Sequence, residues 1–302
     1  HHRSSAASDV YKRQLYIFHF FNMNLYSQEY NEKIEFISSN PFSLNDIIEN
    51  LDNQDKQEVF GKLIIPVDSN NLNKKYPLVI GVAGSLGWAD HHYEYLKMYR
   101  KMGIATFELN SFKSRGISST VGTQNEVTIA AMIVDSYMAL EKLSDHPLID
   151  KNRISITGWS LGGGVTLFSA WLPVKNKFNK NLSFASHLAY YPPCFIEPEN
   201  LEFSNSPIHI LIGDLDNWTP APPCEILVEK LKVNTNINIT VYDNSHHSFD
   251  RNSPVIRNEE AYNFSNCIFK MTSDGKILMN YFQIPMSNSC LLYTSPSPRD
   301  TL

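Results

Sequence analysis

The stretch that decides the fold is residues 153–164, which read RISITGWSLGGG. The first half is rich in β-branched residues and predicts a strand over 153–158, while a helix is predicted to begin directly after it at residue 161. Ser160 therefore lies at a sharp strand-to-helix turn, with a glycine two residues before it and another two residues after it. A glycine-rich turn can simply cap a helix, but G-x-S-x-G between a strand and a helix is typical of a nucleophile elbow.

On both sides of this turn, short apolar strands alternate with helices. The predicted strands are residues 60–67, 77–83, 104–109, 153–158, 182–191, 207–213 and 237–242, and the predicted helices are residues 90–102, 125–143, 161–172 and 223–231. Parallel strands need crossover connections, and helices in these connections cover both faces of the sheet. The sequence therefore predicts a single α/β domain over residues 60–289 with a mostly parallel central sheet.

The two ends of the chain differ from this pattern. Residues 4–14 (SSAASDVYKRQ) and 290–300 (CLLYTSPSPRD) resemble translated adapters from shotgun DNA sequencing, and neither shows helical or strand periodicity. We therefore expect residues 1–14 and 290–302 to be adapter-derived tails that are not native.

Residues 15–59 are expected to form a separate N-terminal segment. Its apolar start, LYIFHFF at residues 15–21, is either the remnant of a signal peptide or untranslated sequence that precedes a start at Met23. The first alternative implies a periplasmic or secreted protein and the second a cytoplasmic one, and the localisation stays open.

The composition excludes several kinds of partner. The 302 residues are 42% hydrophobic and carry 26 Lys+Arg against 31 Asp+Glu, a net charge of -5. Without the two tails these counts become 22 and 29, which moves the net charge to -7. Nucleic-acid binding needs a concentrated basic patch, so we expect no nucleic-acid partner. No apolar run approaches the roughly 20 residues of a membrane-spanning helix, so we expect no membrane span. The oligomeric state is not predicted.

A serine nucleophile needs a histidine base and a carboxylate that orients the histidine. In α/β-hydrolases the acid and then the histidine follow later strands of the sheet. Residues 213–220 (GDLDNWTP) follow one predicted strand, and residues 243–250 (DNSHHSFD) follow the last one. Both groups therefore fall at the same edge of the sheet as the serine and in the expected order.

Each of these two loops offers two candidates. We expect Asp216 rather than Asp214 to be the acid, because it lies deeper in its loop and can reach across to a histidine. We expect His247 rather than His246 to be the base, because the aromatic residue two positions later can anchor it.

Acyl transfer also needs N–H donors that stabilise an oxyanion. The N–H of Leu161 is one candidate, because it directly follows the nucleophile. The second is expected in the tight turn at residues 84–87, with Ser85 preferred and Leu86 as the alternative. His91 and His92 lie near the expected site with only Asp90 close to them, so we expect no metal and no other cofactor. His187 and His209 alternate with apolar residues, which favours core histidines.

Together these sequences resemble the dienelactone hydrolase-like family of the α/β-hydrolase superfamily. The resemblance covers roughly residues 62–250 and rests on the runs at 158–162, 213–224 and 242–250 and on NSF…RG at 110–116. It implies an α/β-hydrolase fold and a triad of Ser160, Asp216 and His247.

The resemblance also implies a role for Arg115, which would lie at the mouth of the site. There it would either hold its loop or bind an anionic substrate. Trp159 is expected to contact the substrate as well. Two features depart from the family pattern: Ser160 replaces the cysteine nucleophile of dienelactone hydrolases, and Ala83-Gly84 stands where many α/β-hydrolases have His-Gly.

Cys194 and Cys224 follow consecutive strands and could meet near the site. A disulfide between them would favour export, whereas two thiols would favour the cytoplasm. The sequence leaves the pairing open.

The functional prediction is a cofactor-independent serine hydrolase that cleaves small-molecule carboxylic esters or lactones through an acyl-enzyme. The alternatives are a serine peptidase of the prolyl-oligopeptidase type and a catalytically silent α/β-hydrolase that serves as a binding protein. An intact triad argues against the silent alternative.

Overall fold

The computed structural model describes residues 28–68, 74–257, 263–265 and 268–278. Both expected adapter tails and the apolar run at 15–21 lie outside the described residues. Within the described residues, no helix is long and apolar enough to cross a membrane.

An eight-stranded sheet forms the centre of the molecule, with strand order β1-β2-β4-β3-β5-β6-β8-β9. The strands are β1 (Gln28–Ser39), β2 (Lys56–Val67), β3 (Tyr76–Val82), β4 (Ala105–Leu109), β5 (Ile149–Trp159), β6 (His187–Tyr190), β8 (Ile208–Gly213) and β9 (Ile237–Tyr242). The pairs β1–β2 and β2–β4 are antiparallel, and all the other pairs are parallel. This is the expected α/β-hydrolase fold with a mostly parallel sheet.

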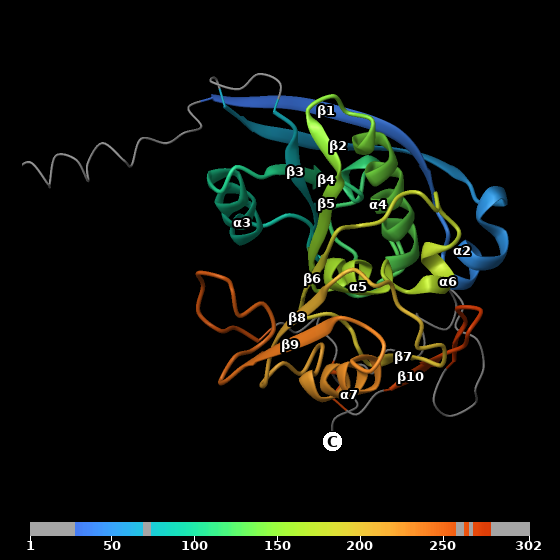
Figure 1. Cartoon of the computed structure of the whole chain (residues 1–302). Coiled ribbons are helices and arrows are strands. Elements are labelled where there is room, and N and C mark those ends of the chain that lie inside the picture. Colours follow the sequence, from blue (N-terminus) through green and yellow to red (C-terminus); the bar gives the residue numbers. More distant parts are fainter. Residues whose placement is uncertain (1–27, 69–73, 258–262, 266–267, 279–302) are drawn as a thin grey trace, which may run out of the picture.

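Helices cover both faces of this sheet, as Figure 1 shows. The helices are α2 (Leu44–Asn50), α3 (Asp90–Lys101), α4 (Ile129–Ser144), α5 (Leu161–Phe168), α6 (Leu172–Lys175) and α7 (Ala221–Leu231). Helix α3 lies on one side, and α4 and α5 lie on the other. A small second sheet has the order β11-β10-β7 and consists of β7 (Ile196–Pro198), β10 (Phe269–Met271) and β11 (Ile277–Leu278).

The N-terminal part of the sheet extends beyond what the sequence predicts. Strand β1 pairs with β2 over its whole length, from Gln28 with Val67 to Ser39 with Lys56. The domain start expected at residue 60 therefore falls inside β2, and residues 28–59 add a strand and a helix to the same fold. Ile34 and Ile47 from this region are buried in the main hydrophobic core.

Two helices differ from their expected limits for local reasons. Helix α4 begins at Ile129 rather than at residue 125, because the Thr128 side chain accepts a hydrogen bond from the N–H of Ala131 and caps the first turn. Helix α5 ends at Phe168 rather than at residue 172. The chain then starts the separate helix α6, in which Pro173 occupies the first turn, where its missing N–H is tolerated.

Candidate active site

The turn between β5 and α5 carries Ser160 in a strained conformation. Its φ of 56° and ψ of -112° lie outside the regions that non-glycine residues normally occupy. Two close backbone approaches hold the turn: a Cβ at Gly158 would collide with the carbonyl oxygen of Gly162, and one at Gly162 would collide with that of Val82. The glycines at these positions are therefore required by packing, and the turn projects the Ser160 side chain at the carboxyl edge of the sheet.

The structure brings together the three residues that the sequence singles out. The Nε2 atom of His247 lies 2.9 Å from the Ser160 Oγ, and its Nδ1 atom lies 2.7 Å from the Asp216 Oδ2. Because an ionised carboxylate only accepts hydrogen bonds, Nδ1–H donates to Asp216. The unprotonated Nε2 then faces the serine hydroxyl, which is the tautomer that a general base requires.

Asp216 is fully buried and its carboxylate is held by several donors. Its Oδ1 accepts from the N–H groups of Trp218 (3.0 Å) and Thr219 (2.8 Å), and its Oδ2 accepts from the Thr219 hydroxyl (2.9 Å). Asp214, the alternative acid, is exposed and accepts instead from the N–H of Ser245 at 3.1 Å. That hydrogen bond is the main cause that lowers the pKa of Asp214. Asp214 thus holds the histidine loop and does not face the imidazole.

Two aromatic rings fix the imidazole of His247. The ring of Tyr191 meets it edge-on with centroids 4.7 Å apart, and the ring of Trp218 lies 4.9 Å away on an inclined plane. The neighbouring His246 is exposed. Phe249, the expected anchor, packs on Tyr191 and Tyr242 rather than on the imidazole itself.

The expected oxyanion loop forms a tight turn beside Ser160. The N–H of Gly87 donates to the carbonyl of Gly84 at 2.9 Å, and the carbonyl of Ser85 accepts from the N–H of Thr120 at 2.9 Å. The N–H groups of Ser85 and Leu161 donate to none of the described residues. Both are therefore free to act as donors, and Ser85 lines the pocket together with Leu86, the alternative donor.

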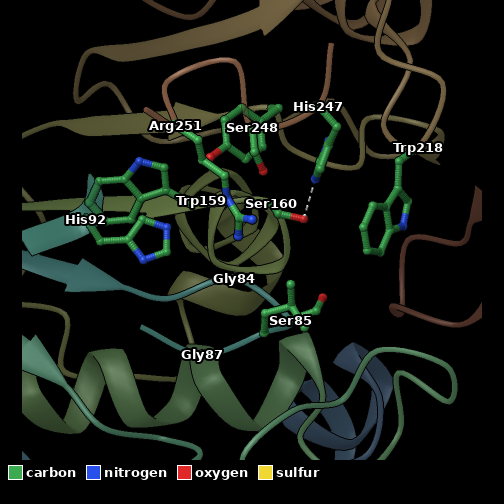
Figure 2. A pocket seen from close by; sticks show the side chains of 12 residues that line it. Gly84, Ser85, Gly87, His92, Trp159, Ser160, Trp218, His247, Ser248 and Arg251 are labelled. Atoms are coloured by element: carbon green, nitrogen blue, oxygen red, sulfur yellow. Dashed lines mark hydrogen bonds between the residues drawn. The ribbon is translucent and has the colours of Figure 1, made fainter. Parts of the chain in front are cut away.

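The pocket above Ser160 encloses about 330 Å³, including open solvent at its mouth. Figure 2 shows Ser160 and His247 at its centre, with Ser85 below them and Trp218 to one side. Arg251 also lines the pocket, as Figure 2 shows. Its Nε atom is buried without a hydrogen-bond partner among the described residues. The sequence reasoning missed Arg251, although its position four residues after His247 on the same loop was a usable signal.

Arg115 lies away from this pocket. Its guanidinium forms a bidentate pair with the fully buried Asp135 (2.7 and 3.0 Å) and also donates to Asn40 and to the carbonyl of Ser111. Only 7% of the side chain is exposed. Arg115 therefore holds its own loop, which is one of the two roles that the resemblance implies, since its N–H groups donate to residues of the protein.

Trp159, for which the sequence predicts contact with the substrate, lines the pocket but is only 1% exposed. Its indole N–H donates to the Asp250 carboxylate at 3.1 Å. Trp159 thus forms part of the pocket wall, and its polar atom is used inside the protein.

Four other histidines differ in their surroundings. His92 is buried beside Trp159 and His91 is buried beside His92, and burial lowers the pKa of His92 to about 2. No group of three or more metal-binding side chains occurs among the described residues.

His187 is a core histidine whose Nδ1 lies 2.9 Å from the carbonyl oxygen of Thr166. His209, by contrast, is exposed and contacts the hydroxyl of Thr240 on β9, so it is not the core histidine that was expected.

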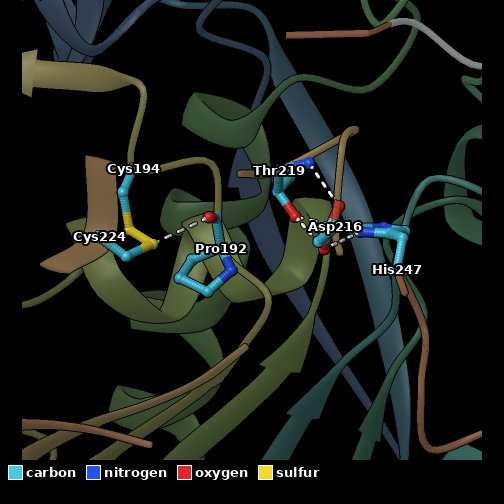
Figure 3. The surroundings of a disulfide bond; sticks show 6 residues. All are labelled: Pro192, Cys194, Asp216, Thr219, Cys224 and His247. Carbon is cyan, nitrogen blue, oxygen red and sulfur yellow. Dashed lines mark hydrogen bonds and ion pairs between the residues drawn. A yellow bond between two sulfur atoms is a disulfide. The ribbon is translucent and has the colours of Figure 1, made fainter. Parts of the chain in front are cut away.

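Cys194 and Cys224 form a disulfide bond, which settles the pairing that the sequence left open. Figure 3 shows it beside the loop that carries Asp216 and Thr219. Cys194 follows β6 and Cys224 lies in α7, so the bond ties the loop after β6 to the helix that follows the acid loop.

Comparison with known proteins identifies the family of the chain. The model of the dienelactone hydrolase family matches residues 97–267, which is more than half of the chain. No curated protein matches the sequence.

Several solved structures share the fold. A Klebsiella pneumoniae protein named as a dienelactone hydrolase is 19% identical with a TM-score of 0.51, over 76% of this chain and 94% of that one. Esterase 2 of Thermogutta terrifontis is 15% identical with a TM-score of 0.50, over 67% of this chain and 83% of that one. A Bacteroides ovatus protein named as a dipeptidyl aminopeptidase IV is 16% identical with a TM-score of 0.53, over 73% of this chain but 33% of that one. At these identities the likeness concerns the fold alone.

Proposed function

The chain belongs to the dienelactone hydrolase family, and we propose that it is a serine hydrolase of carboxylic esters or lactones. The observation that carries the proposal is the continuous hydrogen-bonded path from Asp216 through His247 to Ser160, with contacts of 2.7 and 2.9 Å. A serine held in this way can be deprotonated as it attacks a carbonyl carbon.

In the first half of the reaction, His247 accepts the Ser160 proton as Oγ bonds to the carbonyl carbon. The carbonyl oxygen becomes an oxyanion, for which the free N–H groups of Leu161 and Ser85 are the proposed donors. The positive end of α5 lies beside the same atoms and favours the negative charge. His247 then gives its proton to the leaving alcohol, and the acyl group stays on Ser160.

In the second half, water attacks the acyl-enzyme with His247 again as the base, and Ser160 is released with its proton restored. Asp216 stays ionised and stabilises the imidazolium that forms in each half. A lactone follows the same path, except that the leaving alcohol remains part of the product.

Arg251 restricts the class of ester or lactone that we propose as substrate. Its guanidinium brings a positive charge to a pocket whose other lining residues include no lysine, arginine, aspartate or glutamate. A carboxylate on the substrate, close to the scissile ester, would pair with this group in a bidentate arrangement. We therefore propose that anionic esters or lactones are preferred over neutral ones.

A fluorophosphonate probe tests the proposal directly. The wild-type protein should be labelled, and Ser160→Ala should be neither labelled nor active, with a loss of turnover on the order of 10⁶-fold. A wild-type protein that is not labelled would refute the mechanism and favour the silent binding protein, whereas a Ser160→Ala variant that is labelled equally would refute Ser160 as the nucleophile.

Substrate panels separate the ester hydrolase from the peptidase. We expect turnover of short p-nitrophenyl esters and little turnover of aminoacyl p-nitroanilides. The reverse order would favour the peptidase alternative.

A further inference from the structure

Asp250 is a buried carboxylate that the proposed reaction does not use. It lies three residues after His247 in the loop that follows β9, and its side chain is only 2% exposed. No lysine or arginine of the described residues pairs with it. A buried polar side chain is costly unless its atoms are hydrogen-bonded, so an apolar residue would serve packing alone at least as well.

Its two oxygens each accept a hydrogen bond from a neutral aromatic donor. Oδ2 accepts from the indole N–H of Trp159 at 3.1 Å, and Oδ1 accepts from the hydroxyl of Tyr191 at 3.0 Å. The Nε2 atom of the buried His91 lies 3.9 Å from Oδ1 and has no hydrogen-bond partner. Burial is the largest cause that lowers the pKa of His91, which disfavours a charged imidazolium beside Asp250.

Each of these two donors adjoins a residue of the proposed triad, either in the chain or through a ring contact. Trp159 directly precedes Ser160 in the elbow, and the ring of Tyr191 packs edge-on against the imidazole of His247. Tyr191 itself follows β6, and its N–H donates to the carbonyl of Leu211 in β8. One carboxylate thus joins the end of β5, the end of β6 and the histidine loop after β9.

We propose that Asp250 is a positioning residue that fixes the histidine loop against the nucleophile elbow and so keeps His247 Nε2 at hydrogen-bond distance from Ser160. This inference rests on the proposed serine-hydrolase function. Asp250 acts through Trp159 and Tyr191, and it touches neither the substrate nor the reacting atoms.

The test compares Asp250→Ala with Asp250→Asn. The asparagine oxygen can accept from Trp159, and its NH₂ group can donate to the Tyr191 hydroxyl, so the two links are kept. Asp250→Ala removes both. Since a misplacement of about 1 Å can cost about 10²-fold, we expect Asp250→Ala to lower kcat on p-nitrophenyl acetate by this order with little change in KM. Asp250→Asn should stay within about fivefold of the wild type.

Asp243→Ala is the matched control. Asp243 lies in the same loop with an exposed side chain that makes no hydrogen bond to the described residues, and its replacement should leave kcat unchanged. Tyr191→Phe deletes one of the two donors. It should lower kcat severalfold, and its effect should vanish in the Asp250→Ala background because both changes break the same link.

Three outcomes would overturn the inference: wild-type kcat in Asp250→Ala, an Asp250→Asn variant as slow as Asp250→Ala, or additive effects of Asp250→Ala and Tyr191→Phe. If Asp250→Ala does not fold, Tyr191→Phe decides, and an unchanged kcat in that variant would overturn the inference.

A readout that needs no turnover separates this inference from the proposed function. The Nδ1 proton of His247, bonded to Asp216, should give a low-field NMR signal in the wild type and in Asp250→Asn. In Asp250→Ala it should broaden or disappear. A wild-type protein with this signal but no esterase activity would refute the function and still test the positioning role, and an unaltered signal in Asp250→Ala would refute that role.

Discussion

The Nε2 atom of His247 lies 2.9 Å from the Oγ of Ser160, although 87 residues separate them in the chain. Ser160 follows β5 and His247 follows β9, and only β6 and β8 lie between these two strands. The contact therefore depends on loops that must reach across two strands at one edge of the sheet. Residues that fix these loops are as important to the geometry as the triad itself.

The assignment of the acid gives a sharp prediction. Asp216→Asn should lower kcat by about 10⁴-fold, because the amide favours the wrong imidazole tautomer while the shape of the side chain is kept. Asp214→Asn should stay within about tenfold, because Asp214 only accepts a hydrogen bond from Ser245 in the histidine loop. Steady-state kinetics on one p-nitrophenyl ester would compare the two. A larger loss in Asp214→Asn would reverse the assignment.

The elbow and the order of the triad could be predicted because their signals are local. Gly158 is required by a close approach to the carbonyl of Gly162 within the same turn, and the two glycines leave the G-x-S-x-G pattern around Ser160 in the sequence. The choice of Asp216 over Asp214 agrees with the geometry for a related reason. The carboxylate of Asp216 bonds to the N–H groups two and three residues later, which turns it inward.

Other features depend on tertiary contacts that leave no local pattern. Strand β1 finds its partner only in β2, and the sequence offered no sign that residues 28–59 complete the same sheet. His209 alternates with apolar neighbours like a core residue, but the adjacent β9 is the edge strand, so His209 stays exposed.

Replacement of Arg251 tests the preference for anionic substrates. Arg251→Gln should lower kcat/KM by about 10- to 100-fold for an ester that carries a carboxylate near the scissile bond. This range corresponds to a charge-assisted hydrogen bond of about 1.5–3 kcal/mol. A neutral p-nitrophenyl ester should be hydrolysed almost as fast as by the wild type, and the ratio of the two rates is the measurement.

Arg153→Gln is the control for this experiment. Arg153 pairs with Asp150 near the start of β5, and more than half of its side chain is exposed. Its replacement should change neither rate. Equal losses on charged and neutral esters in Arg251→Gln would show that Arg251 supports the loop and does not select the substrate.

Burial of His187 makes the stability depend on pH. Burial is the main cause that lowers the pKa of His187 to about 4, below the ordinary value of 6.5 that applies in the unfolded chain. Between pH 6.5 and about 4 the unfolded chain therefore binds a proton that the folded protein does not bind, so stability falls as the pH falls through this window. Over this window the free energy of unfolding falls by about 3 kcal/mol in total. Above pH 6.5, His187 does not make the free energy of unfolding depend on pH.

Urea unfolding of wild type and His187→Asn between pH 4.5 and 7.5 would measure this effect. The variant keeps an N–H that can donate to the Thr166 carbonyl, and it should lose stability less steeply below pH 6.5, by up to about 1.4 kcal/mol per pH unit. His209→Asn replaces an exposed histidine in β8, and its free energy of unfolding should depend on pH as steeply as that of the wild type. Equal slopes in wild type and His187→Asn would contradict the expectation.

The disulfide should stabilise the fold and the site together. Its two cysteines are 30 residues apart, and a cross-link over such a loop contributes about 2–4 kcal/mol to the free energy of unfolding. Because it ties the loop that carries Tyr191 to the helix after Asp216, its loss should also loosen the packing around His247. We therefore expect reduction to lower the urea midpoint and to reduce kcat more than it raises KM.

A Cys194→Ser/Cys224→Ser variant separates the bond from other effects of the reductant. In the absence of reductant, this variant should show the midpoint and kcat of the reduced wild type, and addition of dithiothreitol should change neither. Wild-type protein that is produced in an oxidising compartment, where disulfides persist, and purified without reductant should contain no free thiol at residues 194 and 224. Full activity in the double variant would show that the bond supports the fold alone, since the triad would then keep its geometry without it.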